Sequence, residues 1–267
     1  MKKQFLQLAI RLLSITAVIT SCKKDGDDPI IPAQEKCYMT SIIDNDDSKD
    51  STAIIYNTDN KVIKLSYYDE DKNPLGYELY TYALNKILQS EYDENDVLEH
   101  EYHHYLNTNG TINHSTYKNI DGNYTDYDTI FYFYEDGYNV KEIVNSVHFY
   151  NATQTSKQSD TIWYTYSDGN KIKMKQKRND GVIEITDYVY DTLEDKNYIS
   201  GQLLIPGIYG KSSKNLVKSS STNNDANDQA TFTYQVNSKG LITNSVSIYT
   251  SDFGTDTFDY NFVYTCK

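Results

Sequence analysis

The pentapeptide His100-Glu101-Tyr102-His103-His104 has the residue types and spacing of a zinc hydrolase motif. In the pattern H-E-x-x-H, two histidines one helical turn apart hold the ion and the glutamate serves as the base. The pattern requires a helix, because on a strand His100 and His104 would stand about 13 Å apart. We therefore keep a zinc-dependent surface hydrolase using His100, Glu101 and His104 as the alternative function. A helix over this segment would support it, and a strand would exclude it.

Two weaker patterns suggest ion binding, and each is incomplete. Residues 69–73 have the alternating oxygens of a calcium loop, but Pro74 stands where a glycine is needed and Tyr80 where the final glutamate is needed. If residues 107–110 make a four-residue turn between two strands, His103 lies roughly opposite His114 and a two-histidine surface site becomes conceivable. Since no ligand or catalytic set is complete, we predict no metal, no cofactor and no enzymatic activity.

The composition favours strands as the elements that position these residues. The 267 residues include 27 tyrosines but only 8 phenylalanines and 4 prolines, and tyrosine suits a half-exposed sheet. From residue 37 onward, β-rich runs alternate with turns such as Asn-Thr-Asn-Gly at 107–110 and Arg-Asn-Asp-Gly at 178–181. The pattern predicts an all-β antiparallel meander of about fifteen strands, curled into a half-barrel or barrel-like sheet, as one domain over residues 37–267.

Several expected strands have one aliphatic face and one polar face that carries tyrosines or lysines. The aliphatic sets are Ile172 with Met174, Ile183 with Ile185 and Val189, and Ile242 with Val246 and Ile248. The opposing sets are Lys171 with Lys173, Lys175 and Lys177, Glu184 with Thr186, Tyr188 and Tyr190, and Thr243 with Ser245 and Ser247. Because lipid-facing positions of a membrane-spanning barrel would carry lysines and aspartates, we do not expect such a barrel.

The N-terminus predicts export and lipidation. A basic start and a short apolar stretch at 12–19 indicate a signal peptide over residues 1–21. The tetrapeptide Ile-Thr-Ser-Cys ending at Cys22 resembles the bacterial lipobox, whose cysteine is acylated and becomes the mature N-terminus. Residues 22–36 are then a lipidated tether, and the membrane is a partner through Cys22. The acidic tether resembles the export signal of Bacteroidota surface lipoproteins, which predicts an outer-membrane location exposed at the cell surface; a plain charged spacer is the alternative.

With Cys22 acylated, Cys37 and Cys266 form an even pair near the two ends of the expected domain. An exported protein folds in an oxidising compartment, where such pairs form disulfides. We predict a disulfide between Cys37 and Cys266 that joins the first and last strands. Two buried free thiols are the alternative.

The segment 201–221 interrupts the hairpin rhythm. It contains Pro206, three glycines and the basic residues Lys211, Lys214 and Lys218. We interpret it as a loop or short helix between strands that covers one open end of the sheet. Its local positive charge also makes it a candidate contact site for an anion.

Taken together, these motifs resemble a known family. The tyrosine, aspartate and glycine hairpins are similar to the Tyr-Asp repeats of secreted bacterial shell proteins. The lipobox, the acidic tether, Cys37, the segment GKSSKNL at 210–216 and Tyr264 before Cys266 resemble a family of Bacteroidota lipoproteins whose domain is described as porin-like. The resemblance covers roughly residues 37–267, implies a curved β-meander and brings no catalytic residues.

The leading prediction is a non-enzymatic, lipid-anchored binding or structural protein of the outer membrane or cell surface. Exposed tyrosines could stack on sugar rings, so a glycan is the most concrete ligand; an acyl chain or a peptide held in the concavity of the sheet is also open. The net charge of −13 excludes a nucleic-acid partner, because a phosphate backbone favours clustered lysine and arginine. The sequence predicts neither the oligomeric state nor the identity of the ligand.

Overall fold

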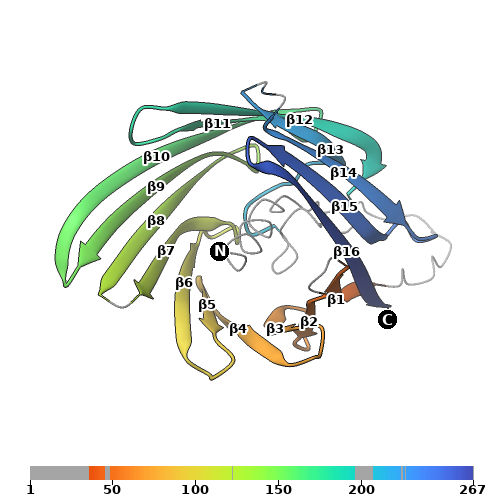
Figure 1. Ribbon diagram of the computed structural model, residues 1–267, viewed down its shortest axis with the longest axis horizontal. Coiled ribbons are helices and arrows are strands. Elements are labelled where there is room, and N and C mark those ends of the chain that lie inside the picture. The colour runs from red at the N-terminus through yellow and green to blue at the C-terminus, as the bar shows by residue number, and fades with distance from the viewer. Residues whose placement is uncertain are drawn as a thin grey trace, which may run out of the picture.

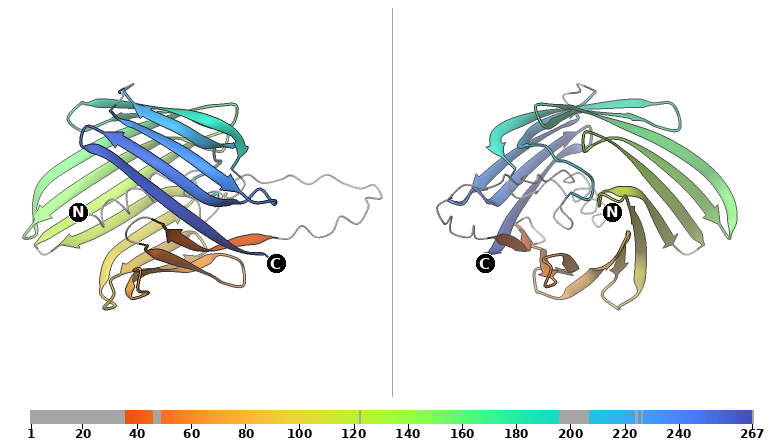
Figure 2. Two further views of the ribbon diagram at one scale, coloured as in Figure 1. Left: turned by 45° about the vertical axis from the view of Figure 1, so that its right-hand side comes forward. Right: turned by 180° about the vertical axis from the view of Figure 1, so that it is seen from behind.

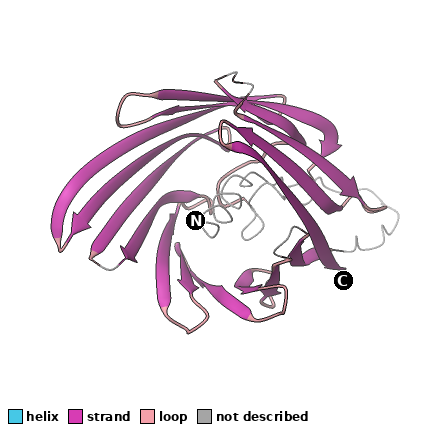
Figure 3. Ribbon diagram, viewed as in Figure 1, coloured by secondary structure: helices cyan, strands magenta, loops and turns pink. Residues whose placement is uncertain are grey.

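The structure, a computed structural model, describes residues 36–45, 49–121, 123–195, 207–223, 225 and 227–266. These ranges contain sixteen strands and no helix (Figures 1 and 3). The strands are β1 (Cys37–Asp44), β2 (Ser51–Tyr56), β3 (Val62–Tyr68), β4 (Pro74–Ala83), β5 (Lys86–Tyr92), β6 (Leu98–Leu106), β7 (Ile112–Asp121), β8 (Tyr124–Glu135), β9 (Tyr138–Tyr150), β10 (Thr153–Ser167), β11 (Asn170–Lys177), β12 (Ile183–Glu194), β13 (Asn215–Thr222), β14 (Gln229–Val236), β15 (Ile242–Ser251) and β16 (Gly254–Cys266). The described residues form no helix that is long and apolar enough to cross a membrane.

The strands form one closed antiparallel barrel (Figure 1). Each strand pairs with the strands before and after it in the sequence, and β1 pairs with β16 to complete the ring. Figure 2 shows the strands tilted across the wall, which closure of a sheet requires. The predicted all-β meander is therefore confirmed, with sixteen strands where about fifteen were expected.

The hairpin turns follow from the asparagine and aspartate residues that begin them. At the turn between β2 and β3, the backbone N–H of Asn57 donates to the carbonyl of Lys61 at 2.9 Å. The side-chain oxygen of Asn57 accepts from the backbone N–H groups of Asp59 and Lys61 at 3.0 and 2.9 Å. The same arrangement recurs at Asp93 and Asn237. A short polar side chain thus satisfies the backbone donors of the turn and fixes the hairpin.

Residues 207–214, which we call the strap, lie directly before β13 and run across one end of the barrel. Backbone hydrogen bonds join the strap to three hairpins, in the donor and acceptor pairs Ile112 to Ile208 (2.7 Å), Lys211 to Gly137 (2.6 Å) and Lys214 to Gly169 (2.8 Å). Gly210 has a φ of +91°, and a Cβ there would lie 2.5 Å from the carbonyl oxygen of Gly137. Only glycine fits this close approach.

The strap agrees with the interpretation of residues 201–221 as a connection that covers an open end of the sheet. One part of that interpretation is wrong, because Asn215–Thr222 forms strand β13 and pairs with both β12 and β14. Residues 201–206 lie outside the described ranges. We call this end of the barrel the strap end, and the opposite end the far end.

The apolar core lies near the strap end. Val62, Ile112 and Ile242 are its most deeply buried side chains, and each begins a strand directly after a turn at that end. Ile208 of the strap packs into the same cluster. The other buried apolar members are Met39, Ile54, Leu65, Tyr80, Ile87, Leu216 and Phe262.

Strand β12 shows which face of the sheet is the inner one. Thr186 is buried, whereas Val189 is 55% exposed and Ile183 is exposed as well. Tyr188 and Tyr190 alternate with Val189 and share the face of Thr186. The predicted alternation is confirmed here, and the tyrosine face is turned inward while the aliphatic face is turned outward.

Strand β11 departs from the predicted alternation. Tyr166 pairs with Lys171 while Thr165 pairs with Lys173, so Ile172 is an extra residue in a β-bulge. Lys171 is only 6% exposed and Ile172 is 38% exposed. Lys171 and Ile172 lie on opposite faces as predicted, but the predictions that Lys171 shares a face with Lys173 and Ile172 with Met174 are wrong.

Strand β15 contains a second bulge of the same kind. Val236 pairs with Ile242 while Gln235 pairs with Asn244, so Thr243 is the extra residue. The bulge turns Ile242 into the core, where it is buried. The prediction that Ile242 shares a face with Val246 and Ile248 is wrong for this reason.

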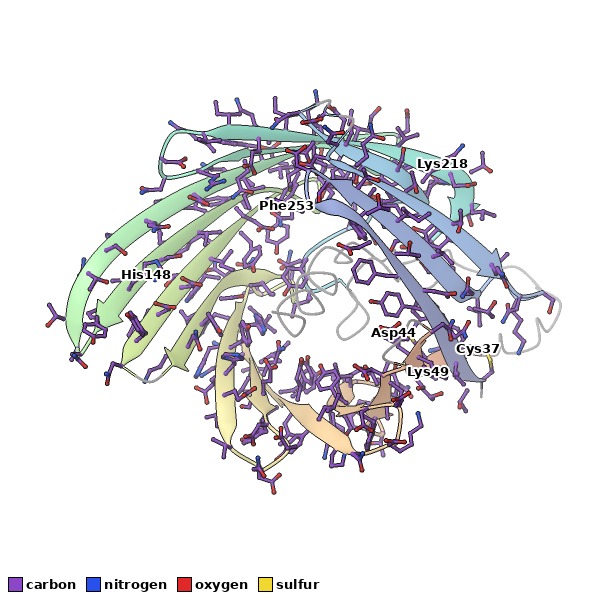
Figure 4. All side chains as sticks on the ribbon, in the orientation of Figure 1. Cys37, Asp44, Lys49, His148, Lys218 and Phe253 are labelled. Carbon is purple, nitrogen blue, oxygen red and sulfur yellow. A yellow bond between two sulfur atoms is a disulfide. The ribbon has the colours of Figure 1, made fainter. Side chains whose placement is uncertain are left out.

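The predicted pair Cys37 and Cys266 is joined by a disulfide between β1 and β16 (Figure 4). The two residues are direct cross-strand partners in the last pairing that closes the barrel. The bond therefore links the ends of a chain segment with a sequence separation of 229. In the loop-entropy model, such a bond stabilises the fold mainly by lowering the conformational entropy of the unfolded chain.

We expect the double substitution Cys37→Ser and Cys266→Ser to lower the free energy of unfolding by up to roughly 5 kcal/mol, the loop-entropy value for a closed segment of this length. The measurement is urea unfolding of the full chain, followed by circular dichroism. Reduced wild-type protein is the control and should unfold at the same urea concentration as the variant. Equal midpoints for oxidised wild type and variant would show that the bond contributes nothing to stability.

Candidate functional site

The inner surface of the barrel is lined by tyrosines whose hydroxyls are shielded from water. Burial raises the pKa of Tyr56, Tyr82 and Tyr190 to about 12. Burial raises the pKa of the other inner tyrosines as well, namely Tyr67, Tyr80, Tyr132, Tyr134, Tyr164, Tyr166, Tyr188, Tyr234 and Tyr249. We call this whole set the inner tyrosines. Because the ionised form is disfavoured there, the set is neutral at neutral pH.

A buried lysine lies among these rings. The ammonium nitrogen of Lys171 is 4.9 Å from the ring centres of both Tyr164 and Tyr188. Burial lowers the pKa of Lys171 to about 8, and the charge of Glu142 partly opposes that shift. Burial raises the pKa of Glu142, although the Asn139 side chain donates to its carboxylate at 2.6 Å. Because of the bulge in β11, the inward position opposite Tyr166 is occupied by the charged side chain of Lys171 instead of the apolar side chain of Ile172.

A second polar cluster surrounds Glu78 on the opposite part of the wall. The Tyr67 hydroxyl donates to the Glu78 carboxylate at 2.5 Å, the Gln89 amide donates to it at 2.9 Å, and the Tyr80 hydroxyl also donates to it. These donors fix the carboxylate in place, and the negative charge of Glu78 adds to burial in raising the pKa of both tyrosines. The cluster therefore has its hydrogen bonds satisfied internally.

The segment that carries the H-E-x-x-H pattern is strand β6. The cross-strand partners of His100 are Glu91 and Asn119, on the inner face, whereas Glu101 pairs with Ser90 on the outer face. A strand places the first and last histidine of the pattern about 13 Å apart. The zinc hydrolase interpretation is therefore wrong for this segment.

His104, the last residue of that pattern, is a buried structural side chain. Its Nδ1 lies 2.8 Å from the hydroxyl oxygen of Ser115, and its Nε2 lies 3.4 Å from the side-chain oxygen of Gln89. Burial, with a small contribution from His103, lowers the pKa of His104 to about 4. The imidazole is therefore neutral at neutral pH and serves as a hydrogen-bonding group inside the wall.

The predicted alignment of His103 with His114 is wrong by two residues. His114 pairs with Tyr105, and His103 pairs with Thr116. The cause is a five-residue connection over 107–111, followed by a register shift next to Leu106. The rings of Tyr105 and His114 stack at 4.4 Å on the outer face. The two histidines do not form a ligand pair.

The acidic turn at 69–73 satisfies its own oxygens. The Asn73 side chain and backbone donate to the two carboxylate oxygens of Asp69 at 2.9 and 2.7 Å. These bonds lower the pKa of Asp69. The interpretation of this segment as a turn is confirmed by the hydrogen bond from Asp69 N–H to the carbonyl of Asn73 at 3.0 Å.

A groove of about 810 Å³ lies at the strap end, along β8, β9 and β10 and beside their turns. Across its floor, Lys141 is the direct cross-strand partner of both Phe133 and Trp163. Phe133 is 43% exposed and Trp163 is 36% exposed. The lining residues are Phe133, Glu135, Asp136, Tyr138, Val140, Lys141, Trp163, Tyr164, Thr165, Tyr166, Ser167, Asp168 and Gly169. Aromatic faces and carboxylates therefore meet at the rim of the barrel.

Cation–π contacts order the aromatic floor of this groove. The ammonium nitrogen of Lys141 lies 5.1 Å from the ring centre of Phe133, and that of Lys175 lies 5.6 Å from the ring centre of Trp163. The rings of Tyr138 and Tyr166 pack at 4.6 Å beside the turns. We call Phe133, Lys141 and Trp163 the groove row.

Sequence reasoning did not find the groove row. Its members are separated by 8 and 22 residues in the sequence and meet only through the register of two hairpins. The available signal was the only tryptophan in the chain, Trp163. Of the other predicted sites, Cys22, the signal peptide over 1–21 and most of the tether over 22–36 lie outside the described residues.

No protein-family profile matches the sequence, and no curated protein matches it. Solved structures do share the fold. A porin-like protein from Bacteroides uniformis superposes with a TM-score of 0.57 at 13% identity, over 85% of this chain and 98% of that chain. A porin-like protein from Bacteroides vulgatus superposes with a TM-score of 0.58 at 10% identity, over 86% of this chain and 99% of that chain.

At these identities the likeness shows the fold alone. The chain is a closed antiparallel β-barrel of the porin-like fold. The fold that the family resemblance implied is thereby confirmed.

The inner tyrosines predict a cooperative alkaline unfolding. Their folded pKa values lie above the ordinary value of 10.0, so the unfolded chain loses phenol protons before the folded chain does. Stability therefore falls as pH rises above about 10. We expect the tyrosinate absorbance and the loss of the β-sheet circular dichroism signal to change together between about pH 10 and 12. Ionisation of nearly all tyrosines near pH 10 in a barrel that stays folded would contradict the burial described above.

Proposed function

We propose that the chain is a non-enzymatic, lipid-anchored binding protein of the outer membrane, exposed at the cell surface, and that the groove at the strap end holds a glycan. The lipobox at Cys22 and the acidic tether support the anchor and the location. The porin-like neighbours support a barrel of the outer membrane or cell surface. The groove supports a binding role.

The observation that carries the glycan is the groove row together with the acidic residues beside it. Phe133 and Trp163 offer partly exposed ring faces, on which the C–H face of a sugar can stack. Glu135, Asp136 and Asp168 line the same groove and can accept hydrogen bonds from sugar hydroxyls. The groove volume of about 810 Å³ falls within the range typical of ligand sites.

An acyl chain or a peptide inside the barrel is the weaker candidate. The inner wall carries the polar side chains Lys171, Glu142, Glu78 and His104, which interrupt the apolar surface that an acyl chain would need to contact. At the strap end the interior is filled by the apolar core and Ile208. A ligand in the groove requires no rearrangement of the polar inner wall or of the apolar core.

We expect Phe133→Ala and Trp163→Ala each to weaken glycan binding by roughly thirtyfold, equivalent to about 2 kcal/mol for a buried aromatic anchor. The full chain is first screened on a glycan array, and the best oligosaccharide is then titrated by isothermal calorimetry. Phe131→Ala is the matched control, because Phe131 is exposed on the same face of β8 and does not line the groove. A chain that binds no glycan, or equal losses at Phe131 and Phe133, would refute the proposed ligand site.

We expect Cys22→Ser to release the protein from the membrane fraction, because acyl chains on that residue are the proposed anchor. Fractionation of cells shows the location, and mass spectrometry of the N-terminal peptide shows the lipid. Protease treatment of intact cells tests surface exposure separately. A variant that remains in the membrane fraction would exclude Cys22 as the anchor without bearing on the groove.

A further inference from the structure

A second cluster of ligand-type side chains lies at the far end of the barrel, at the hairpin of β5 and β6. One ligand atom each from Glu91, Glu99 and His100 lies within 4.8 Å of the others. Among the described residues, this is the group of three histidine or carboxylate side chains whose ligand atoms lie this close together. Within the same ranges, His148 and Asp126 form a pair without a third member, with His148 Nδ1 2.7 Å from the Asp126 carboxylate. We call Glu91, Glu99 and His100 the rim triad.

A β-bulge assembles the rim triad. Tyr92 pairs with Leu98 while Glu91 pairs with His100, so Glu99 is the extra residue of β6. In a regular strand, Glu99 and His100 would point to opposite faces. The bulge changes the direction of a side chain at the rim, which is where such irregularities often serve function. The two carboxylates and the imidazole therefore meet beside the opening of the far end.

We propose that the rim triad binds a divalent transition-metal ion, with Zn²⁺ as the preferred ion. Imidazole nitrogen with carboxylate oxygens is a donor set that suits Zn²⁺, and three protein ligands leave a coordination position for water or another ligand. The charge of a divalent cation offsets two carboxylates held within 4.8 Å of each other. The inference does not depend on the glycan groove, which lies at the strap end.

The surroundings of His100 fit such a role. Its Nδ1 lies 3.1 Å from the hydroxyl oxygen of Tyr117 on the neighbouring strand. When Nδ1 carries the proton and donates it to that oxygen, Nε2 has a lone pair for the metal, which is the usual arrangement around a metal-binding histidine. The rings of His100 and Tyr117 also pack at 5.6 Å. Tyr117 thus orients the imidazole.

The adjoining turn adds a negative field without competing for the ion. Asp93 uses its side-chain oxygen to accept from the backbone N–H groups of Asn95 and Val97 at 2.9 and 2.8 Å. Asp96 accepts from the hydroxyl of Tyr77 at 3.0 Å. These carboxylates are engaged in the turn, so they attract a cation to the rim electrostatically rather than as ligands.

The test is a titration of the full chain with Zn²⁺ in competition with a chromophoric chelator at neutral pH. We expect one Zn²⁺ per chain at the rim triad. His100→Ala and Glu99→Gln should each weaken binding by more than roughly tenfold, since loss of an outer partner alone has about that effect. Tyr117→Phe should weaken it by roughly tenfold while retaining the ligands.

His114→Ala and Glu101→Gln are the matched controls, because both residues lie on the outer face away from the rim triad and should leave the affinity unchanged. Circular dichroism and thermal unfolding of each variant verify the fold, and Glu99 is exposed, so its substitution leaves the core intact. Absence of stoichiometric Zn²⁺ binding would overturn the proposal. Binding that survives both His100→Ala and Glu99→Gln, or that is lost equally in His114→Ala, would overturn it as well.

Discussion

Pairing of the first strand with the last is the constraint on which the rest of this structure depends. An open sheet of sixteen strands would expose two edges of unpaired backbone groups, and closure through β1 and β16 removes both. The disulfide between Cys37 and Cys266 covalently fixes the final pairing. Closure of so many strands also makes a wide ring, because barrel diameter grows with strand number. A wide ring cannot be filled by wall side chains alone, and this explains why the strap enters one end and carries Ile208 into the core.

The same width explains the composition of the inner face. Tyrosine has a large apolar body and one polar group, so it can cover the inside of the wall while its hydroxyl reaches a carboxylate or a backbone carbonyl. The hydroxyls of Tyr56, Tyr82 and Tyr234 each donate to a carbonyl of a neighbouring strand at 2.7, 2.7 and 2.9 Å. Phenylalanine could not make these bonds. The excess of tyrosine over phenylalanine is therefore a consequence of this inner lining, while the buried aliphatic side chains are gathered in the core near the strap end.

Sequence reasoning found the elements that depend on local signals. Turn residues and alternating patterns lie within a few positions of one another, so the meander, the strand β6 over the histidine pattern and the faces of β12 could be predicted. The errors at Lys171, Ile242 and His114 each involve a register shift beside a turn, and at His114 a turn one residue longer than expected adds to it. A bulge is defined by two residues opposite one, and this relation exists only between strands. The groove row and the rim triad were missed for the same reason, since each set is complete only with residues from more than one strand.

The porin-like fold does not by itself determine what such a barrel does, because function is located in sites rather than in folds. In this chain the two candidate sites lie at opposite ends of the wall. The groove row belongs to the strap end, where the turns of two hairpins add carboxylates to aromatic rings, and the rim triad belongs to the far end, where a bulge gathers its ligands. Both occur where regular pairing stops or is interrupted. Within the wall, hydrogen bonding and alternation restrict each side chain to one of two faces, whereas at the ends the backbone has freedom to direct several side chains toward one ligand. Variation at the turns and bulges can therefore change what the protein binds without disturbing the pairing that closes the barrel.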